Sequence, residues 1–447
     1  MSTEEVDAAA QRAWYRHPDL EMTIRAVADA LTAGEGTDMI HQAALQEFLW
    51  LRLPRHYPQR QWLALAESTA AFLEELGEDR LAAIALSEQT ATVLAAWAKG
   101  SAAGIEAFHR AQHSSGVDAP DTAVLQWGSI MGREEATALD AVERALGRAI
   151  SSGKLIPGAP RWRLAALAIT EAVLTRPLDI PPGQTFAGLI TTERVSSWIE
   201  SSTHPLLSDW RSGVANRLLN PIEPPVDPAA AIGPIGWLLA LAAGPGGAAL
   251  TQSNYLARDA VVDAVERFGW WDRDQLPRSE AEVHELRTVR GAAARLRLVR
   301  RRAHRLHTTA RGSKLLAEPA ELWGVVACES EDGEEFTKMV TELVGLRLVL
   351  GQLEQEEIVD DIGSILSSQG WSTDSGPLTT GIVHSAIWRP LRWWSLFSAT
   401  NELESTWEWE SSRRLTPHAV SLRPDGERMV LAYLRSRAAG PRHRPYL

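Results

Sequence analysis

The segment RTVRGAAARLRLVRRRAHRLHTTARGSK, residues 287–314, is the most informative part of this 447-residue chain. It contains no Asp or Glu. Its cations are Arg287, Arg290, Arg295, Arg297, Arg300, Arg301, Arg302, Arg305, Arg311 and Lys314. A cationic run of this density is typical of a surface that meets phosphate or an anionic protein.

The pattern within and before this segment predicts a helix followed by a hairpin. Ser279 and Glu282 have the spacing of a capping box, so a helix is expected to begin there. Its expected buried face consists of Val283, Leu286, Val289, Ala293 and Leu296. The arms LVRRR (residues 298–302) and RLHTT (residues 305–309) predict a β-hairpin, and a closing helix is expected through residues 315–323.

Earlier residues supply the other elements of the same module. Residues 235–243 predict a first helix, and residues 248–251, after the turn GPGG, predict a short strand. Val261, Val265 and Phe268 predict a second helix that ends near Gly269. The expected order is therefore helix, strand, helix, helix, two-stranded wing and helix, which is the order of a winged helix-turn-helix.

A resemblance to known sequences points the same way. The segment LHTTARGSKLL, residues 306–316, resembles the ending of many bacterial winged-helix proteins. The whole stretch is similar to modules in uncharacterised proteins from bacteria with high GC content. The resemblance covers roughly a sixth of the chain and implies the fold only.

A second, degenerate copy of the pattern is predicted for residues 334–438. Residues 336–350 and 358–366 predict its first two helices, and Pro390 is expected to end or kink the third. Gly426 precedes a closing helix as Gly312 does in the first copy. The second wing would be chemically different, because Trp407 and Trp409 alternate with glutamates, which suits a protein partner better than phosphate.

The length and pattern of the chain predict a mainly α protein with several domains. A helical domain is expected at residues 1–175, and a helical connector with the proline-rich linker PIEPPVDP at residues 176–228. The first winged helix, which is basic, is expected at residues 229–328. The second, with its acidic and aromatic wing, is expected at residues 334–438.

Charge is distributed unevenly over these regions. Residues 226–328 carry 14 basic and 11 acidic side chains, whereas residues 1–225 carry 19 and 28. The whole chain has a net charge of −12. A local basic patch in an acidic protein is typical of nucleic-acid binders, since only the patch must meet phosphate. The acidic remainder limits how much of the protein can lie on DNA.

Several classes of chemistry lack support in the sequence. There is no glycine-rich phosphate loop ending in Lys, no His-Glu-x-x-His pair and no Gly-x-Ser-x-Gly elbow. A single cysteine, Cys328, excludes an internal disulfide and a cysteine-based zinc site. We therefore expect no catalytic residues, metal or cofactor, although an active site assembled from distant positions stays possible. The polar start and the lack of a long apolar run predict a cytoplasmic protein without a membrane span.

Two functional hypotheses remain. The first is a DNA-binding protein, a transcriptional regulator or chromosome-associated factor. Its predicted DNA contacts are Arg287, Arg290, Arg297, Arg300, Arg301, Arg302, Arg305, Arg311 and Lys314. The alternative is a non-enzymatic scaffold that uses its winged helices to bind protein or a second copy of itself, with Trp407 and Trp409 as contacts. Winged helices serve both purposes, so the fold does not choose between them.

Overall fold

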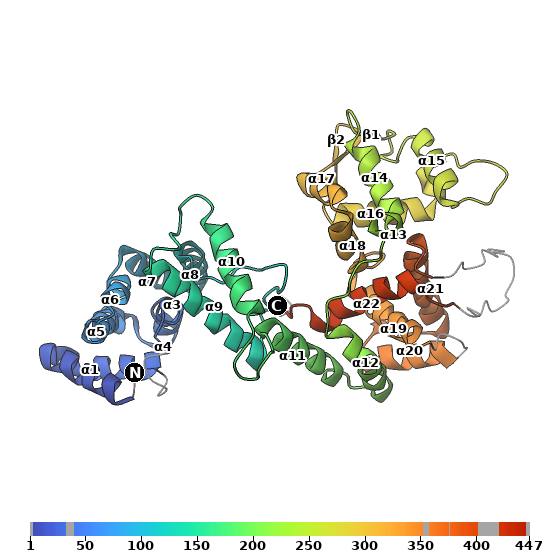
Figure 1. Cartoon of the computed structure of the whole chain (residues 1–447). Helices are drawn as coiled ribbons and strands as arrows, with labels where there is room; N and C mark the ends of the chain where they lie inside the picture. Colours follow the sequence, from blue (N-terminus) through green and yellow to red (C-terminus); the bar gives the residue numbers. More distant parts are fainter. Residues whose placement is uncertain (1–2, 33–39, 352–356, 375, 401–419, 444–447) are drawn as a thin grey trace. The chain divides into compact units, whose positions relative to one another are not determined.

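The computed structural model describes residues 3–32, 40–351, 357–374, 376–400 and 420–443. Within them it is built of helices with two small sheets (Figure 1). The prediction of a mainly helical protein is confirmed. The chain divides into an N-terminal unit, residues 1–190 with 441–447, and a C-terminal unit, residues 191–440. Helix α11 (Phe186–Glu200) crosses this division, so the connector expected at residues 176–228 is shared between the two units.

The N-terminal unit consists of helices that pack around shared hydrophobic cores. They are α1 (Thr3–Arg16), α2 (Glu21–Thr32), α3 (Gln42–Glu47), α4 (Leu53–His56), α5 (Trp62–Glu75), α6 (Asp79–Ala85), α7 (Glu88–Lys99), α8 (Ser101–Ser115), α9 (Arg133–Ser151) and α10 (Trp162–Thr175). The second half of α5 is buried on all sides. A π-helical turn, Phe48–Arg52, connects α3 to α4. Its Trp50 is buried, donates from the indole to Thr90 Oγ1 at 2.9 Å and accepts from the indole of Trp97 at 2.8 Å.

Among the described residues, the stretch Asp79–Lys99 is long and apolar enough to cross a membrane by length and composition alone. Core helices meet the same criterion. The stretch consists of two helices, α6 and α7, with Ser87 capping the second through the amide of Thr90. Val93 and Trp97 of α7 lie in the hydrophobic core, so burial accounts for part of its apolar composition.

The first half of the C-terminal unit contains the cationic segment. Its elements are α12 (Pro205–Leu218), α13 (Pro228–Ala231), α14 (Gly233–Ala243), β1 (Ala248–Ala249), α15 (Arg258–Phe268), α16 (His284–Arg295), β2 (Val299–Arg302), β3 (Arg305–Thr308), α17 (Ala310–Ala317) and α18 (Pro319–Ala327). The three strands form one antiparallel sheet in the order β1-β3-β2. Helix α14 packs against β3, α16 and α17.

Two close backbone contacts in this half require glycine. Gly247 has φ 75°, and a Cβ atom there would lie 2.6 Å from Nδ1 of His307. At Gly312 a Cβ atom would lie 2.1 Å from the carbonyl oxygen of Leu298. The side chain of Thr309 caps α17 by accepting from the Gly312 amide at 2.9 Å. The amide of Thr309 donates to the carbonyl of Leu298 at 2.9 Å, so the helix begins beside the residue that precedes the hairpin.

The second half of the C-terminal unit comprises α19 (Glu335–Val349), α20 (Glu357–Ser368), β4 (Ser372–Thr373), β5 (Gly376–Pro377), α21 (Thr380–Leu396) and α22 (Pro424–Ala439). The two halves share one hydrophobic core, which contains Leu286 from the first and Leu343 from the second. The small sheet of β4 and β5 was not predicted. The strands expected for the second wing lie mostly outside the described residues. Among the described residues that flank them, an isolated antiparallel bridge joins Thr400 to Leu422.

A buried carboxylate connects four helices of this unit. Glu342 of α19 is 1% exposed and accepts from Arg211 of α12 at 2.7 Å and from the indole of Trp198 of α11 at 3.0 Å. Arg437 of α22 donates to its other oxygen at 3.3 Å. With both oxygens bonded, the buried charge is compensated.

Two backbone motifs of the first half recur in the second half. Each motif contains a left-handed residue, and the two left-handed residues are separated by the same number of positions in each half. Helices α15 and α20 each end at a left-handed glycine, Gly269 with φ 67° and Gly370 with φ 84°. A tryptophan follows each glycine. The amides of Trp270 and Trp371 donate to a carbonyl in the last turn of the preceding helix, at 3.2 and 3.1 Å.

The second recurring motif connects the third helix of each half to the closing helix. Arg297 after α16 and Ser398 after α21 are both left-handed, with φ 56° and 53°. In each half, the carbonyl of the next residue accepts from the amide of the closing helix's N-cap residue, at 2.9 and 3.0 Å. The same carbonyls exclude a Cβ atom at Gly312 and Gly426, where it would lie 2.1 and 1.8 Å away.

Two element boundaries differ from the sequence-based expectation. The side chain of Ser279 caps a 3-10 turn, Glu280–Glu282, and α16 begins only at His284. The closing helix is divided into α17 and α18 at Glu318, because the residue before Pro319 is disfavoured in the helical conformation. Pro319 then occupies the first turn of α18, where its missing amide costs nothing.

Candidate nucleic-acid interface

Helix α16 and the hairpin β2–β3 place the cationic residues on the surface of the first half. Leu286, Val289 and Ala293 are fully buried and fix which side of α16 faces the core. Arg287 is consequently exposed. The hairpin turns through Ala303 and the residue after it, both with positive φ, as a two-residue turn between right-twisted strands requires.

The pleat of the hairpin divides its arginines between two faces. Arg301 pairs across the strands with Leu306 and faces a groove of about 420 Å³ between the hairpin and α16, which Arg287 also lines. Arg302 pairs with Arg305 and lines a second hollow of about 350 Å³ beside the C-terminal end of α14, and Arg300 lines both hollows. Successive strand residues alternate in this way, so no one face holds all three consecutive arginines.

Arg290 has a structural role that the sequence pattern did not indicate. Its Nε lies 2.8 Å from Oε1 of Glu280, whose residue is completely buried, and its Nη1 donates to the carbonyl of Asn254 at 2.7 Å. The other oxygen of Glu280 accepts from the amide of Leu256 at 2.7 Å. Burial raises the pKa of Glu280, while the Leu256 amide, Arg290 and Arg287 oppose that rise. Arg290 is thus already occupied as the partner of a buried acid.

Arg295 is also occupied, by the acidic loop of residues 329–335. Its Nη2 donates to the carbonyls of Ser330 and Glu331 at 2.8 and 2.7 Å. On the same side of α16, Nε2 of His284 lies 3.2 Å from the Glu331 carboxylate. The acidic loop therefore covers one side of the helix that was expected to meet DNA. The acidic run is visible in the sequence. Its packing against α16 is a long-range contact, which no pattern of neighbouring residues predicts.

Arg305 and Lys314, two more predicted contacts, also have partners within the chain. Nη1 of Arg305 donates to the carbonyls of Gly246 and Gly247 at 3.2 and 3.0 Å, which ties the hairpin to the turn before β1. Lys314 lies 3.7 Å from Glu318 and 3.4 Å from Glu321. The Glu318 and Glu321 carboxylates raise the pKa of Lys314, which is fully exposed.

Six arginines are left as the exposed charge of this surface: Arg287, Arg297, Arg300, Arg301, Arg302 and Arg311. Within the described part of the chain, none of the six forms an ion pair with a carboxylate. Arg287 makes one weak contact, from Nη1 to the Ala281 carbonyl at 3.5 Å. These six side chains, here called the free arginines, are the part of the predicted site that is available to an anionic partner.

The other predicted contact residues, Trp407 and Trp409, lie outside the described residues. The described parts of the chain hold no group of three or more His, Cys, Asp or Glu residues arranged to bind a metal ion. The free arginines supply charged hydrogen-bond donors, and their chemistry suits the binding of an anionic partner.

Comparison with known proteins yields one match. The family described as Y4jL N-terminal domain matches residues 234–321, which extend from α14 into α18 and include the hairpin. The match covers less than half of the chain. No curated protein and no solved structure matches the chain.

Proposed function

We propose that this protein binds double-stranded DNA through the free arginines, as a transcriptional regulator or chromosome-associated factor of the cytoplasm. The observation that carries the proposal is the set of six exposed arginines that, within the described residues, have no carboxylate partner and lie close together in the sequence of an otherwise acidic chain. Each can fork onto a phosphate or onto a guanine edge. Arg290, Arg295, Arg305 and Lys314 are not part of this proposal, because each has a partner within the chain.

The arrangement of elements supports a winged helix-turn-helix. Helix α14 precedes strand β1, helices α15 and α16 follow it, and the hairpin β2–β3 comes next, in the place of the wing. The three strands form one sheet of order β1-β3-β2. In DNA-binding members of that superfamily the third helix enters the major groove. Arg287 on α16 would then meet the groove, and the hairpin arginines would meet flanking phosphate.

The recurring motifs of the second half support a second copy of the same module. The left-handed residues Gly370 and Ser398 and the close contact at Gly426 reproduce the backbone of the first copy. The cations are arranged differently in the second copy: its third helix, α21, carries Arg389, which is paired with Asp332, and it buries Trp393 and Trp394 in the core. We assign DNA contact to the first copy and a supporting role to the second.

Fluorescence anisotropy on a mixed-sequence duplex tests the proposal. If all six free arginines neutralise phosphate, the logarithm of the affinity should fall with the logarithm of salt concentration with a slope of about −5. Replacing Arg300, Arg301 and Arg302 by Ala should weaken binding and reduce the slope by about 2 to 3 units. Folding should be retained, because these side chains are exposed and make no ion pair within the described chain.

A matched control removes the same charge elsewhere. Arg25, Arg60 and Arg176 of the N-terminal unit are also exposed, so their triple Ala variant has the same net charge as the wing variant. The control should bind DNA as the wild type does. If wild type fails to bind at about 50 mM salt, or if the two variants lose affinity equally, the free arginines are not a DNA site.

One observation favours the alternative, a scaffold that binds protein. Trp237 of α14, Phe268 at the end of α15 and Trp270 just after it form a half-buried aromatic cluster, with the Phe268 ring centroid 6.0 Å from that of Trp237 and 4.8 Å from that of Trp270. Aromatic side chains of this kind are enriched in protein interfaces. Two results together would establish the scaffold in place of the DNA-binding function. Wild type should self-associate in size-exclusion chromatography while the Trp270→Ala variant does not, and wild type should not bind DNA.

A further inference from the structure

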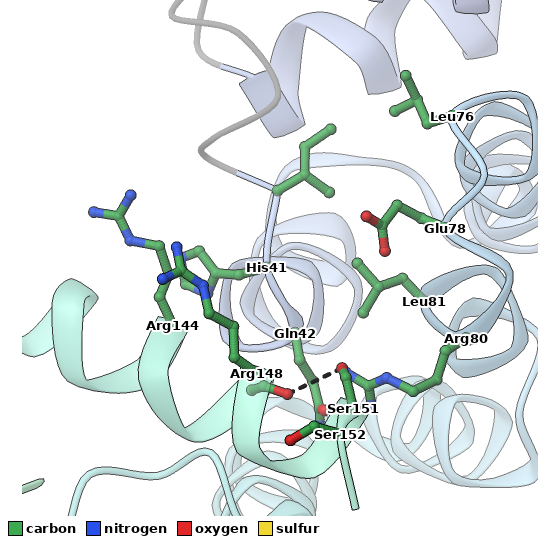
Figure 2. A pocket seen from close by; sticks show the side chains of 12 residues that line it. His41, Gln42, Leu76, Glu78, Arg80, Leu81, Arg144, Arg148, Ser151 and Ser152 are labelled. Carbon is green, nitrogen blue, oxygen red and sulfur yellow. Dashed lines mark hydrogen bonds between the residues drawn. The ribbon is translucent and has the colours of Figure 1, made fainter. Parts of the chain in front are cut away.

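The N-terminal unit contains a pocket of about 640 Å³ that the proposed DNA surface does not involve. It lies between α3, α6 and the C-terminal part of α9 (Figure 2). Ile40, Leu76 and Leu81 give it apolar walls. Pockets of this size with apolar walls and a few polar groups typically hold small molecules.

The histidine in this pocket is accounted for by local structure. Nε2 of His41 lies 2.8 Å from Oδ1 of Asp140, and Nδ1 accepts from the amide of Ala44 at 3.4 Å, which caps α3. Burial lowers the pKa of His41. The ring is therefore neutral, donates to Asp140 and has no free nitrogen for a metal ion or for acid–base chemistry.

The arginines of the pocket are different. Arg144 is paired with Asp140, on the same helix. Arg80 reaches the pocket from α6 and donates from Nη1 to the neutral amide oxygen of Gln42, at 2.7 Å. Burial lowers the pKa of Arg80, because its charge is partly removed from water, and the carboxylate of Glu78 opposes this change. Arg148 of α9 is exposed and forms no ion pair within the described residues.

The lining charges favour an anion. Arg144 is neutralised by Asp140, and the other lining arginines, Arg80 and Arg148, face one lining carboxylate, Glu78. Figure 2 shows Arg144 and Arg148 entering from α9 and Arg80 from the other side of the pocket. A phosphate ester carries about −1.5 to −2 charges near pH 7, whereas a single carboxylate carries −1. Its oxygens also match the planar donor fork of arginine.

We propose that this pocket binds a small molecule with a phosphoryl group, which Arg80 and Arg148 hold while the remainder packs against Ile40, Leu76 and Leu81. The bound anion would compensate the half-buried charge of Arg80. The site is independent of the DNA surface, so either assignment can fail without the other.

Isothermal titration of the full chain with inorganic phosphate at constant ionic strength tests this site. Wild type should bind phosphate in preference to chloride. Arg148→Gln should weaken phosphate binding about tenfold or more, as expected for the loss of a charged hydrogen-bonding partner. Arg80→Gln should do the same and serves as a second variant if the first fails to fold by circular dichroism.

Two controls separate this pocket from other cations. Arg60→Gln removes an exposed arginine of the same unit that does not line the pocket, and it should leave phosphate binding unchanged. The Ala variant of Arg300, Arg301 and Arg302 should also retain it. The proposal is overturned if wild type binds no phosphate, if Arg148→Gln binds it as wild type does, or if only the wing variant loses it. Binding of malonate without phosphate would likewise exclude a phosphoryl ligand.

Discussion

Replacing Arg290 by Ala should destabilise the C-terminal unit, and most of the loss should depend on pH. The change leaves the carboxylate of Glu280 completely buried with one remaining hydrogen bond, from the Leu256 amide. The carbonyl of Asn254 loses its bond as well. Arg287, three residues earlier on the same helix, is exposed, so its Ala variant should change the stability by less than about 0.5 kcal/mol.

The magnitude follows from the cost of keeping the buried carboxyl neutral. Without Arg290, the pKa of Glu280 in the folded state rises further above its ordinary value of 4.5, so between that value and the raised pKa folding takes up a proton and stability falls as pH rises. Removing one partner of a buried ion pair costs about 3 to 5 kcal/mol where the remaining group would be charged, so we expect a loss of about 3 kcal/mol at pH 7 and a smaller loss at pH 5, close to the ordinary pKa of the carboxyl. The lost bond to Asn254 adds about 1 kcal/mol at both values.

Urea unfolding followed by tryptophan fluorescence at pH 7 and pH 5 measures this difference. Arg290→Ala should lose about 4 kcal/mol at pH 7 and about 2 kcal/mol at pH 5, and adding Glu280→Gln should remove the pH dependence. An equal loss at the two pH values, or a loss no greater than that of Arg287→Ala, would refute the structural role assigned to Arg290.

Three further outcomes are expected in the same unfolding assay. Gly312→Ala should lower the stability by several kcal/mol, because its Cβ atom would lie 2.1 Å from the carbonyl oxygen of Leu298. In the control Gly324→Ala, the added Cβ atom meets no atom within 4 Å, so the stability should be unchanged or slightly higher. Glu143→Gln should flatten the pH dependence between about pH 5 and 8. Burial and neighbouring carboxylates raise the pKa of Glu143 to about 8, so the wild type loses stability as pH rises through that range, and the variant should be about 2–4 kcal/mol more stable at pH 8.5. Glu342→Gln should cost about 3 kcal/mol or more, since it leaves its buried arginine partner without a counter-charge.

The sequence predicted those parts of the C-terminal unit that depend on neighbours along the chain. The hairpin arms and the helix that ends at Gly269 follow from strand composition and a left-handed glycine. The break before Pro319 was missed, although the residue before a proline avoids the helical region.

The candidate site was predicted less well, because charge density says nothing about which charges are already paired. Arg290 meets Glu280, ten positions earlier, and Arg295 meets carbonyls of the acidic loop, thirty-five positions later. Neither contact has a periodic signal. The pocket beside Arg80 and Arg148 was missed for the same reason, since its walls come from three helices separated in the sequence.

The alternation of arginines along β2 restricts the shape of any partner. Of the two hollows beside the ribbon, Arg301 lines one, Arg302 lines the other, and Arg300 lines both. A flat anionic surface could therefore touch Arg301 or Arg302 at a time, leaving the other in solvent. Only a partner with two anionic walls, between which the ribbon enters edge first, could bind both. The two modes differ in a measurable way: the losses of Arg301 and of Arg302 would be additive for two walls, whereas for a flat partner only one of the two changes would matter.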